Sequence, residues 1–308
     1  MTTYSIKISD TYHGKLATLS NDWIGDFIHN GKIWETHVDT IIQTMVGSED
    51  GVMNIGTHIG THAIPMAKRA KVFYGFEPQP ILFWLLGANL VNNGVTKYHI
   101  YNNAVGHQSG VEVTMEGRDY QTSQTINYGA TAIGTGTVKV KTIKIDDLDI
   151  KDKIRLILVD VEGMEPAVFH GARKLIARDR PVLVFERNYL TITEDMKRMC
   201  GIDEEVSKFL IEDFVKDLNY NPLVAYSYDV FLVPKPEKVV GLADKYKGGW
   251  EYQHGRLMKG SAFSELIIWY EYDRILAVFQ KEGLFTARVA ENGEIHWDKS
   301  AVWYPEEI

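Results

Sequence analysis

The chain has 308 residues, of which 45% are hydrophobic, and a formal net charge of −8 at pH 7. This length fits one large domain or two domains, and the composition can fill a sizeable core. The acidic balance argues against a dedicated nucleic-acid-binding protein, because phosphate contacts need clustered lysines and arginines.

Cysteine content and hydropathy bear on the cellular compartment. Cys200 is the only cysteine, so no intrachain disulfide can form, and a reducing compartment is the simpler interpretation. The first residues lack the apolar core of a signal peptide, and no apolar run approaches the roughly 20 residues of a membrane helix. We therefore expect a cytoplasmic protein that binds neither membranes nor nucleic acid.

Residues 1–50 are expected to form a helical cover segment over one face of a sheet. Residues 20–31 predict a short helix or loop that ends at Gly31. Residues 35–46 carry apolar side chains at helical spacing. The aromatic residues of this region favour packing roles over ligand binding, because large aromatics dominate cores.

Residues 51–236 alternate between predicted strands and helices. Such alternation predicts right-handed crossovers and a mostly parallel sheet. The expected strands are 51–55, 71–76, 97–101, 111–115, 138–145, 155–159 and 181–185; the expected helices are about 60–69, 80–91, 164–177 and 203–218; an antiparallel pair, 223–226 and 229–233, closes the domain.

Two segments differ in character from this alternation. Residues 117–137 are polar and glycine-rich, which indicates either a solvated loop or a lid beside a site. Residues 237–308 hold four of the seven tryptophans and predict a hairpin around Asn292-Gly293. We expect a small β-rich appendage that serves packing or oligomer contact, with glycan binding as the alternative.

A glycine-rich turn follows the first strand of the predicted sheet. Gly56 and Gly60 lie four residues apart between that strand and the next helix, where the backbone can approach a ligand closely. Glu77 follows the second strand, where a carboxylate can accept hydrogen bonds from both hydroxyls of a ribose. The turn and the acid together predict a cofactor that contains adenosine, although the spacing is not G-x-G-x-x-G.

Polar side chains follow several other predicted strands. In an open α/β sheet, ligands bind beyond the carboxyl ends of the strands, so these side chains are expected to share one edge. They are Asn54, Glu77, Asn102, Asn103, Asp160, Glu162 and Glu186.

The order and spacing of these segments resemble the FkbM family of S-adenosylmethionine-dependent methyltransferases. The resemblance covers about residues 20–235. It is carried by residues 52–60, Glu77-Pro78, Asn102 to Gly106, Asp146, Val159 to Gly163, Gly171 to Leu175 and Pro181 to Glu186.

This resemblance implies a Rossmann-like class I fold, a seven-stranded sheet with one antiparallel strand. It implies methyl transfer to an oxygen, typically a hydroxyl of a sugar or natural product. It places Gly56 and Gly60 at the methionine part of S-adenosylmethionine, Glu77 at the ribose, and Asn103 and Ala104 near the adenine, with Thr57, His58 and Pro78 as further cofactor contacts. The resemblance also implies that Asp160, Glu162 and Glu186 face the acceptor.

The first turn departs from the family pattern Asp-x-Gly-Ala-Asn-x-Gly. Asn54 replaces the acid, and it can still accept a hydrogen bond from the ammonium group of the cofactor, but it brings no charge. His58 replaces the asparagine of that pattern. We favour a solvated loop histidine over one that reaches the acceptor.

Methyl transfer needs an aligned acceptor oxygen and a group that removes its proton. Asp160 is the first candidate base and Glu186 the second, whereas Glu162 suits helix capping as well as catalysis. Neighbouring acids can also hold a divalent cation, but we do not favour one, and no zinc site is expected.

Two other functions remain open from the sequence. One is an NAD-dependent oxidoreductase or epimerase, which suits Glu77 but not the spacing of the two glycines. The other is a non-catalytic protein that keeps the fold and binds glycans or partners through the tryptophan-rich tail. The acceptor is expected to be a small molecule or glycan, and the appendage can support a homo-oligomer.

Overall fold

The computed structural model describes residues 4–118, 120, 124–186 and 192–207, and the strand segments 220–224, 229–234, 250–253, 256–259, 287–289 and 295–297. The chain divides into two compact units, Met1–Leu210 and Ile211–Ile308. This division falls earlier in the chain than the boundary predicted at residue 236. No helix in the described part of the chain is long and apolar enough to cross a membrane.

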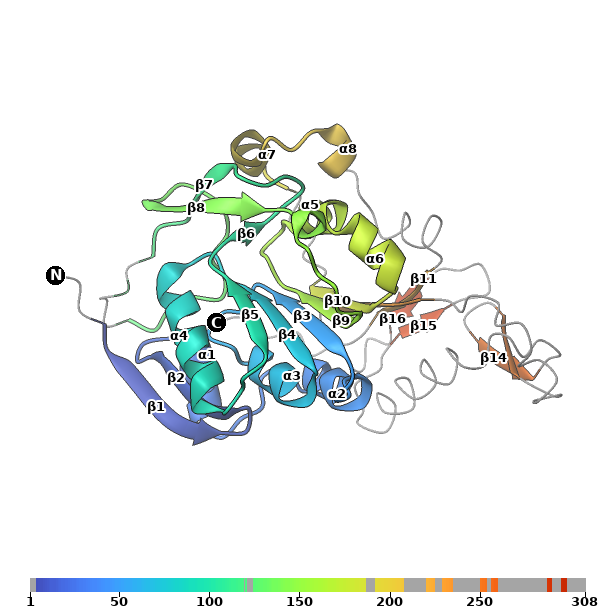
Figure 1. The fold of residues 1–308 in the computed structure, drawn as a ribbon, viewed down its shortest axis with the longest axis horizontal. Helices are drawn as coiled ribbons and strands as arrows, with labels where there is room; N and C mark the ends of the chain where they lie inside the picture. Colours follow the sequence, from blue (N-terminus) through green and yellow to red (C-terminus); the bar gives the residue numbers. More distant parts are fainter. Residues whose placement is uncertain are drawn as a thin grey trace. The chain divides into compact units, whose positions relative to one another are not determined.

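A parallel sheet forms the centre of the first unit (Figure 1), as the sequence predicts. Its strands lie side by side in the order β10, β9, β3, β4, β5. Every residue of β3 and β4 is buried, which agrees with their largely apolar character, with Asn54 as the polar exception. The strands are β3 (Gly51–Ile55), β4 (Val72–Phe76), β5 (Tyr98–Tyr101), β9 (Ile154–Val159) and β10 (Val182–Glu186).

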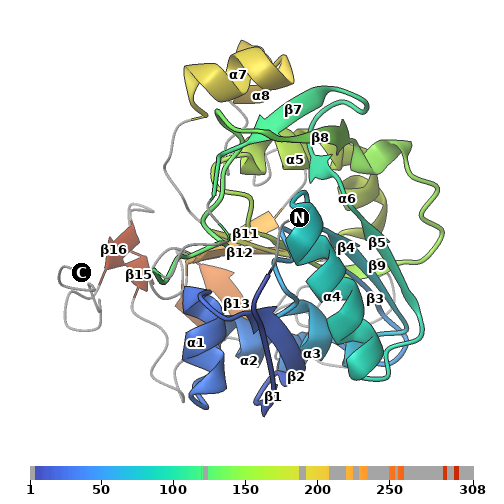
Figure 2. The same cartoon turned by 90° about the vertical axis from the view of Figure 1, so that its left-hand side faces the viewer.

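Helices cover both faces of this sheet (Figure 2). The helices between β3 and β5 lie on one side and those between β9 and β10 on the other, as right-handed crossovers require when the strand order reverses. The helices are α1 (Trp23–His29), α2 (Thr36–Met45), α3 (Ala63–Arg69), α4 (Pro80–Asn92), α5 (Glu165–Gly171) and α6 (Arg173–Asp179).

The helix predicted over residues 164–177 is two helices instead of one. Ala172 separates α5 from α6, with φ −110° and ψ 8°, and its N–H donates to the carbonyl of Phe169, three residues back. Gly171 lies so close to Gly106 that a Cβ atom would come within 2.1 Å of its carbonyl oxygen. This backbone contact accompanies the break, which apolar spacing alone does not reveal.

A β-hairpin, β1 (Ile6–Thr11) and β2 (Gly14–Leu19), precedes α1 and was not predicted. The helical cover predicted for residues 1–50 therefore holds for α1 and α2 but not for residues 6–19. Two asparagines, one in α4 and one that follows its last residue, explain the difference, because they bind β2 as a neighbouring strand would. Asn89 pairs with the N–H and C=O of Ala17, and Asn93 pairs with those of Lys15.

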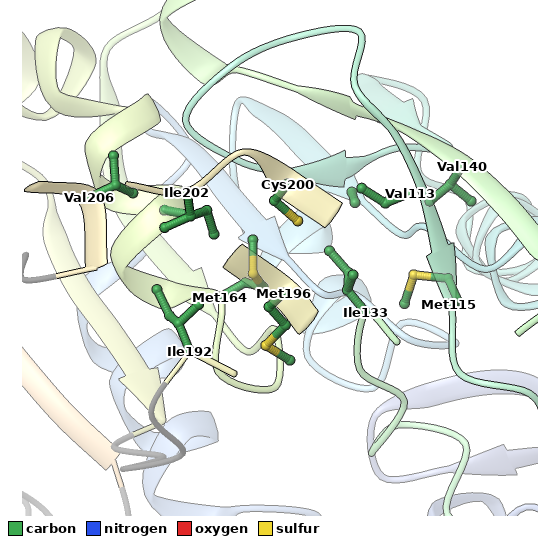
Figure 3. Packing of buried hydrophobic residues seen from close by; sticks show 12 residues of the cluster. Val113, Met115, Ile133, Val140, Met164, Ile192, Met196, Cys200, Ile202 and Val206 are labelled. Carbon is green, nitrogen blue, oxygen red and sulfur yellow. The ribbon is translucent and has the colours of Figure 1, made fainter. Parts of the chain in front are cut away.

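A small sheet in the order β6, β8, β7 lies beside the main sheet and has its own core. Figure 3 shows apolar side chains gathered there, including Met115, Met164, Met196 and the free, buried Cys200. The elements are β6 (Ala104–Val105), β7 (Glu112–Met115), β8 (Val138–Ile143), the 3-10 turn η1 (Ile145–Asp147), α7 (Glu194–Cys200) and α8 (Glu204–Ser207).

The second unit contains three antiparallel strand pairs among its described residues. The pair predicted after residue 220 and the hairpin predicted near the C-terminus are both present. Most of the helix predicted over residues 203–218, and the apolar stretch 262–272, lie outside the described residues. The strands are β11 (Tyr220–Val224), β12 (Asp229–Pro234), β13 (Trp250–Gln253), β14 (Arg256–Lys259), β15 (Ala287–Val289) and β16 (Ile295–Trp297).

Candidate functional site

The candidate site lies where the strand order of the parallel sheet reverses. The chain runs from β3 outward to β5 on one side and continues with β9 and β10 on the other. At this point the carboxyl ends of β3 and β9 lie side by side. A Cβ atom on Gly56 would lie 1.7 Å from the carbonyl oxygen of Asp160, so only glycine fits there, and its φ of +82° also favours glycine. Ligands bind in open α/β sheets at such a switch point.

The turn from Gly56 to Gly60 is attached to the end of β4. The N–H groups of Gly56 and Thr57 donate to the carbonyl of Phe76, at 2.9 and 3.1 Å. The N–H of Gly60 donates to the carbonyl of Thr57, at 2.9 Å, and closes the turn. The expected glycine-rich turn therefore has a fixed position between the first two strands of the sheet.

Glu77 connects this turn to the start of α4. Its Oε2 accepts the N–H of His58 at 2.8 Å, and its Oε1 accepts the N–H of Gln79 at 2.9 Å. The side chain is buried at 4% exposure. An ionised carboxylate has about four acceptor positions, so each oxygen keeps capacity for a further donor.

Burial dominates the electrostatics of Glu77. It raises the pKa of the carboxyl group to about 7, and the N–H groups of Gln79 and His58 only partly oppose it. Burial also raises the pKa of Tyr120, and the nearby charge of Glu77 adds to this shift. A buried acid with a perturbed pKa at a switch point is typical of a functional site.

Residues 124–131, part of the segment predicted as a lid or loop, lie against this acid through Gln79. The side chain of Gln79 donates to the carbonyl of Tyr128 at 3.3 Å, and Tyr120 donates its hydroxyl to the same side chain. The rings of Tyr120 and Tyr128 stack with centroids 4.8 Å apart. Tyr128 is fully buried, so the middle of this segment is packed into the fold, whereas Gln124 and Thr125 are exposed.

The other residues expected to contact the cofactor lie in different places around the site. They are Asn54, Pro78, Asn103 and Ala104. Asn54 is buried at the end of β3 and donates to the carbonyl of Leu158 in β9 at 3.5 Å. Asn103 donates to the carbonyl of Lys141 at 2.9 Å, and the buried Ala104 pairs with β8. The residue that contacts the corner at Glu77 and Pro78 is Asn102, which donates to both of their carbonyls at 2.8 and 2.9 Å.

The acids expected to face an acceptor follow β9. Asp160 is exposed, and its N–H donates to the carbonyl of Ile55 at 2.9 Å. Glu162 is half-buried and has a φ of 53°, in the left-handed region that non-glycine residues rarely adopt. Burial raises the pKa of Glu162, and the charge of Arg118 opposes the shift. Glu186 ends β10, but its side chain lies outside the described residues.

Arg118 and Glu116 are the charged residues that act on Glu162 in the turn after β9. Their side chains pair at 3.3 Å, and Arg118 also donates to the hydroxyl of Thr131 at 3.0 Å. Both charges act on Glu162. Within the described part of the chain, no group of three or more His, Cys, Asp or Glu side chains could hold a metal ion.

The sequence interpretation missed several residues that the fold brings to Glu77. Asn102 was noted at a strand end, but its neighbour was chosen. Gln79 follows Glu77-Pro78 directly, so its position was the available signal. Tyr120, Tyr128 and Asp22 reach the site through long-range contacts that no local pattern indicates.

Known proteins give three comparisons with this chain. No curated protein sequence matches it. The fold is similar to a solved FkbM methyltransferase from Methylobacillus flagellatus, with 14% identity and a TM-score of 0.40, over 68% of this chain and 60% of that one. The chain thus spans less than two thirds of that protein's length.

Two further solved structures are similar. A candidate methyltransferase from Streptococcus mutans, solved in complex with SAH, has 13% identity and a TM-score of 0.39, over 65% of this chain and 97% of that one. A tRNA methyltransferase from M. jannaschii has 13% identity and a TM-score of 0.42, over 75% of this chain and 54% of that one.

The family model described as the methyltransferase FkbM domain matches residues 54–221. The match begins at Asn54 beside the glycine-rich turn and ends inside β11, so it includes Glu77 and the turn after β9. It covers more than half of the chain, which therefore belongs to the FkbM methyltransferase family.

Proposed function

We propose that this protein is an S-adenosylmethionine-dependent O-methyltransferase that acts on a hydroxyl of a sugar, a glycan or a glycosylated small molecule. The observation that carries the proposal is the buried Glu77, held between the N–H groups of His58 and Gln79 at the end of β4. This acid lies in a chain of the FkbM methyltransferase family. The hydroxyl acceptor is the expectation that the sequence resemblance carries.

The residues around Glu77 fit an adenosine-containing cofactor. Each oxygen of the carboxylate accepts one backbone N–H and keeps acceptor capacity for a ribose hydroxyl. Gly56 and Gly60 would line the methionine part, Asn54 would accept from its ammonium group, and Asn102 holds the corner beside the ribose. When bound, the cofactor supplies an activated methyl group.

The acids after β9 would orient the acceptor hydroxyl and remove its proton. The half-buried Glu162 suits the base, because burial raises its pKa toward the pH of the reaction, where a general base is most efficient. The exposed Asp160 would bind a second hydroxyl of the acceptor. The surrounding charges, Arg118 between Glu116 and Glu162, favour a neutral acceptor with several hydroxyl groups.

The same proposal includes a seven-stranded sheet, a role for residues 237–308 and a cytoplasmic location. The family match ends inside β11, which supports a sheet completed by β11 and β12 to seven strands. Residues 237–308 would then be an appendage for packing or oligomer contact. The single cysteine supports a cytoplasmic location.

Isothermal titration calorimetry with S-adenosylhomocysteine tests the proposed function. We expect the wild-type protein to bind it, and Glu77→Ala to weaken binding by at least about tenfold, because the ribose loses a charge-assisted partner. The matched control is Glu112→Ala, which removes an exposed acid paired with Lys139 and should bind normally.

Catalysis is tested by methyl transfer to a panel of glycans. Glu162→Gln should lower turnover while the affinity for S-adenosylhomocysteine stays within about threefold of wild type. Absence of S-adenosylhomocysteine binding by the wild type, or binding of NAD in its place, would show that the proposal is wrong.

A further inference from the structure

The backbone N–H of His58 binds Glu77, and His58 itself has an unusual backbone conformation. Its φ is 50°, in the left-handed region, and its N–H points to Oε2 of Glu77 at 2.8 Å. A non-glycine residue keeps such a conformation only where its surroundings enforce it. The contacts of the His58 ring therefore bear on the position of Glu77.

The His58 ring lies against the carboxylate of Asp22. The distance from Nε2 to Oδ2 is 3.6 Å, and the two side chains are 11% and 0% exposed. Both ring nitrogens are buried and make no hydrogen bond. Burial lowers the pKa of His58 and raises that of Asp22, and the charge of each residue opposes the shift of the other. The carboxylate of Asp22 is the charged group that acts on the His58 ring.

Asp22 belongs to a junction of three segments. Its Oδ2 accepts the N–H of Gly25 and so caps α1. Its backbone forms a bridge with Ile126, and the N–H of Trp23 donates to the Ile126 carbonyl at 2.9 Å. The carboxylate therefore contacts α1 and the His58 ring, while its backbone pairs with residues 124–131.

We propose that Asp22 and His58 form a positioning pair, through which α1 and residues 124–131 hold Glu77 ready for the ribose of the cofactor. Asp22 fixes the ring, the ring fixes the left-handed backbone of His58, and that backbone directs its N–H to Glu77. Neither side chain touches the reacting atoms in this role. The inference rests on the proposed function, because it assigns Glu77 to the ribose.

Calorimetry with S-adenosylhomocysteine tests the pair in the full chain. Asp22→Asn and His58→Leu should each weaken binding by about tenfold, and the double variant should be no weaker than either single variant, because both break one chain of contacts. His58→Asn should restore affinity to within about threefold of wild type, since asparagine tolerates the left-handed region without support from the ring.

The controls separate positioning from general loss of stability. Asp39→Asn removes another buried acid, 3% exposed, that lies in α2 and binds Tyr12; it should leave the affinity unchanged. If Asp22→Asn does not fold, Asp22→Ser keeps a helix cap and replaces it in the measurement. Urea denaturation of each variant confirms that the measured protein is folded.

Two outcomes overturn the inference. The first is wild-type affinity in both Asp22→Asn and His58→Leu. The second is additive weakening in the double variant, which would mean that the residues act separately. Either result leaves the proposed function intact if the wild type binds S-adenosylhomocysteine, whereas failure of the wild type to bind removes the proposed function itself.

Discussion

At the scale of single residues, Gly56 is a position where the backbone accepts no residue other than glycine. We expect Gly56→Ala to lower the free energy of unfolding by more than about 3 kcal/mol, because a Cβ atom would lie 1.7 Å from the carbonyl oxygen of Asp160. Gly94 is the matched control, with a φ of +70° and no atom within 4 Å of its Cβ position. Gly94→Ala should cost about 1 kcal/mol, from backbone strain alone. Equal losses in urea denaturation would refute the steric argument.

Glu165 gives a pH dependence of stability whose sign follows from its burial. Burial raises the pKa of Glu165 to about 7, against the N–H groups of Glu165, Val161 and Gly163 that lower it. A raised carboxyl pKa stabilises the fold fully below the unfolded value, near pH 4, and this contribution is lost as the pH rises to about 7. The loss is about 3 kcal/mol, for a shift of two to three pH units at 1.36 kcal/mol each.

Glu165→Gln cannot ionise, so it isolates this contribution. The free energy of unfolding of the wild type minus that of Glu165→Gln should fall as the pH rises from 4 to about 7 and stay constant above it. Urea denaturation across this range provides the measurement. A difference that does not change with pH would mean that Glu165 ionises normally in the folded protein.

At the scale of elements, the sequence predicts the parts whose burial is local and regular. The alternation of strands and helices predicted the parallel sheet that contains β3, β4 and β9, and the acid after β4 was predicted as a site residue. The hairpin β1–β2 could not be predicted, because Asn89 of α4 and Asn93, the residue that caps α4, hold it across more than 70 residues. The contacts of Asp22 with His58 and of Tyr128 with Gln79 are also distant in sequence, so local patterns did not reveal them.

The hairpin also gives a prediction about α4. Asn89 is fully buried and bonds the N–H and C=O of Ala17 and the carbonyl of Ile59. Asn89→Ala should lower the free energy of unfolding by about 3 kcal/mol, because it leaves buried backbone groups unsatisfied. Asn93→Ala breaks equivalent bonds to the exposed Lys15 and should cost about 1 kcal/mol, since water replaces the amide. Urea denaturation compares the two, and equal costs would contradict the argument from burial.

At the scale of the whole molecule, the described residues of the proposed cofactor site all lie in the first unit, Met1–Leu210. The family match nevertheless continues to residue 221, inside β11. A pair of strands such as β11 and β12 is marginally stable in water by itself, so it needs a larger sheet. The family match therefore includes residues that follow the first unit.

Truncation separates the family domain from the appendage. A chain ending at residue 236 keeps β11 and β12, and we expect it to bind S-adenosylhomocysteine within about threefold of the full chain, because the site residues and the whole family match remain. A chain ending at residue 210 lacks both strands and should bind at least about tenfold more weakly or fail to fold. Calorimetry and thermal denaturation provide the measurements. Loss of binding in the longer truncation would mean that residues 237–308 contribute to the cofactor site, whereas full binding in the shorter one would mean that the first unit is the complete cofactor domain.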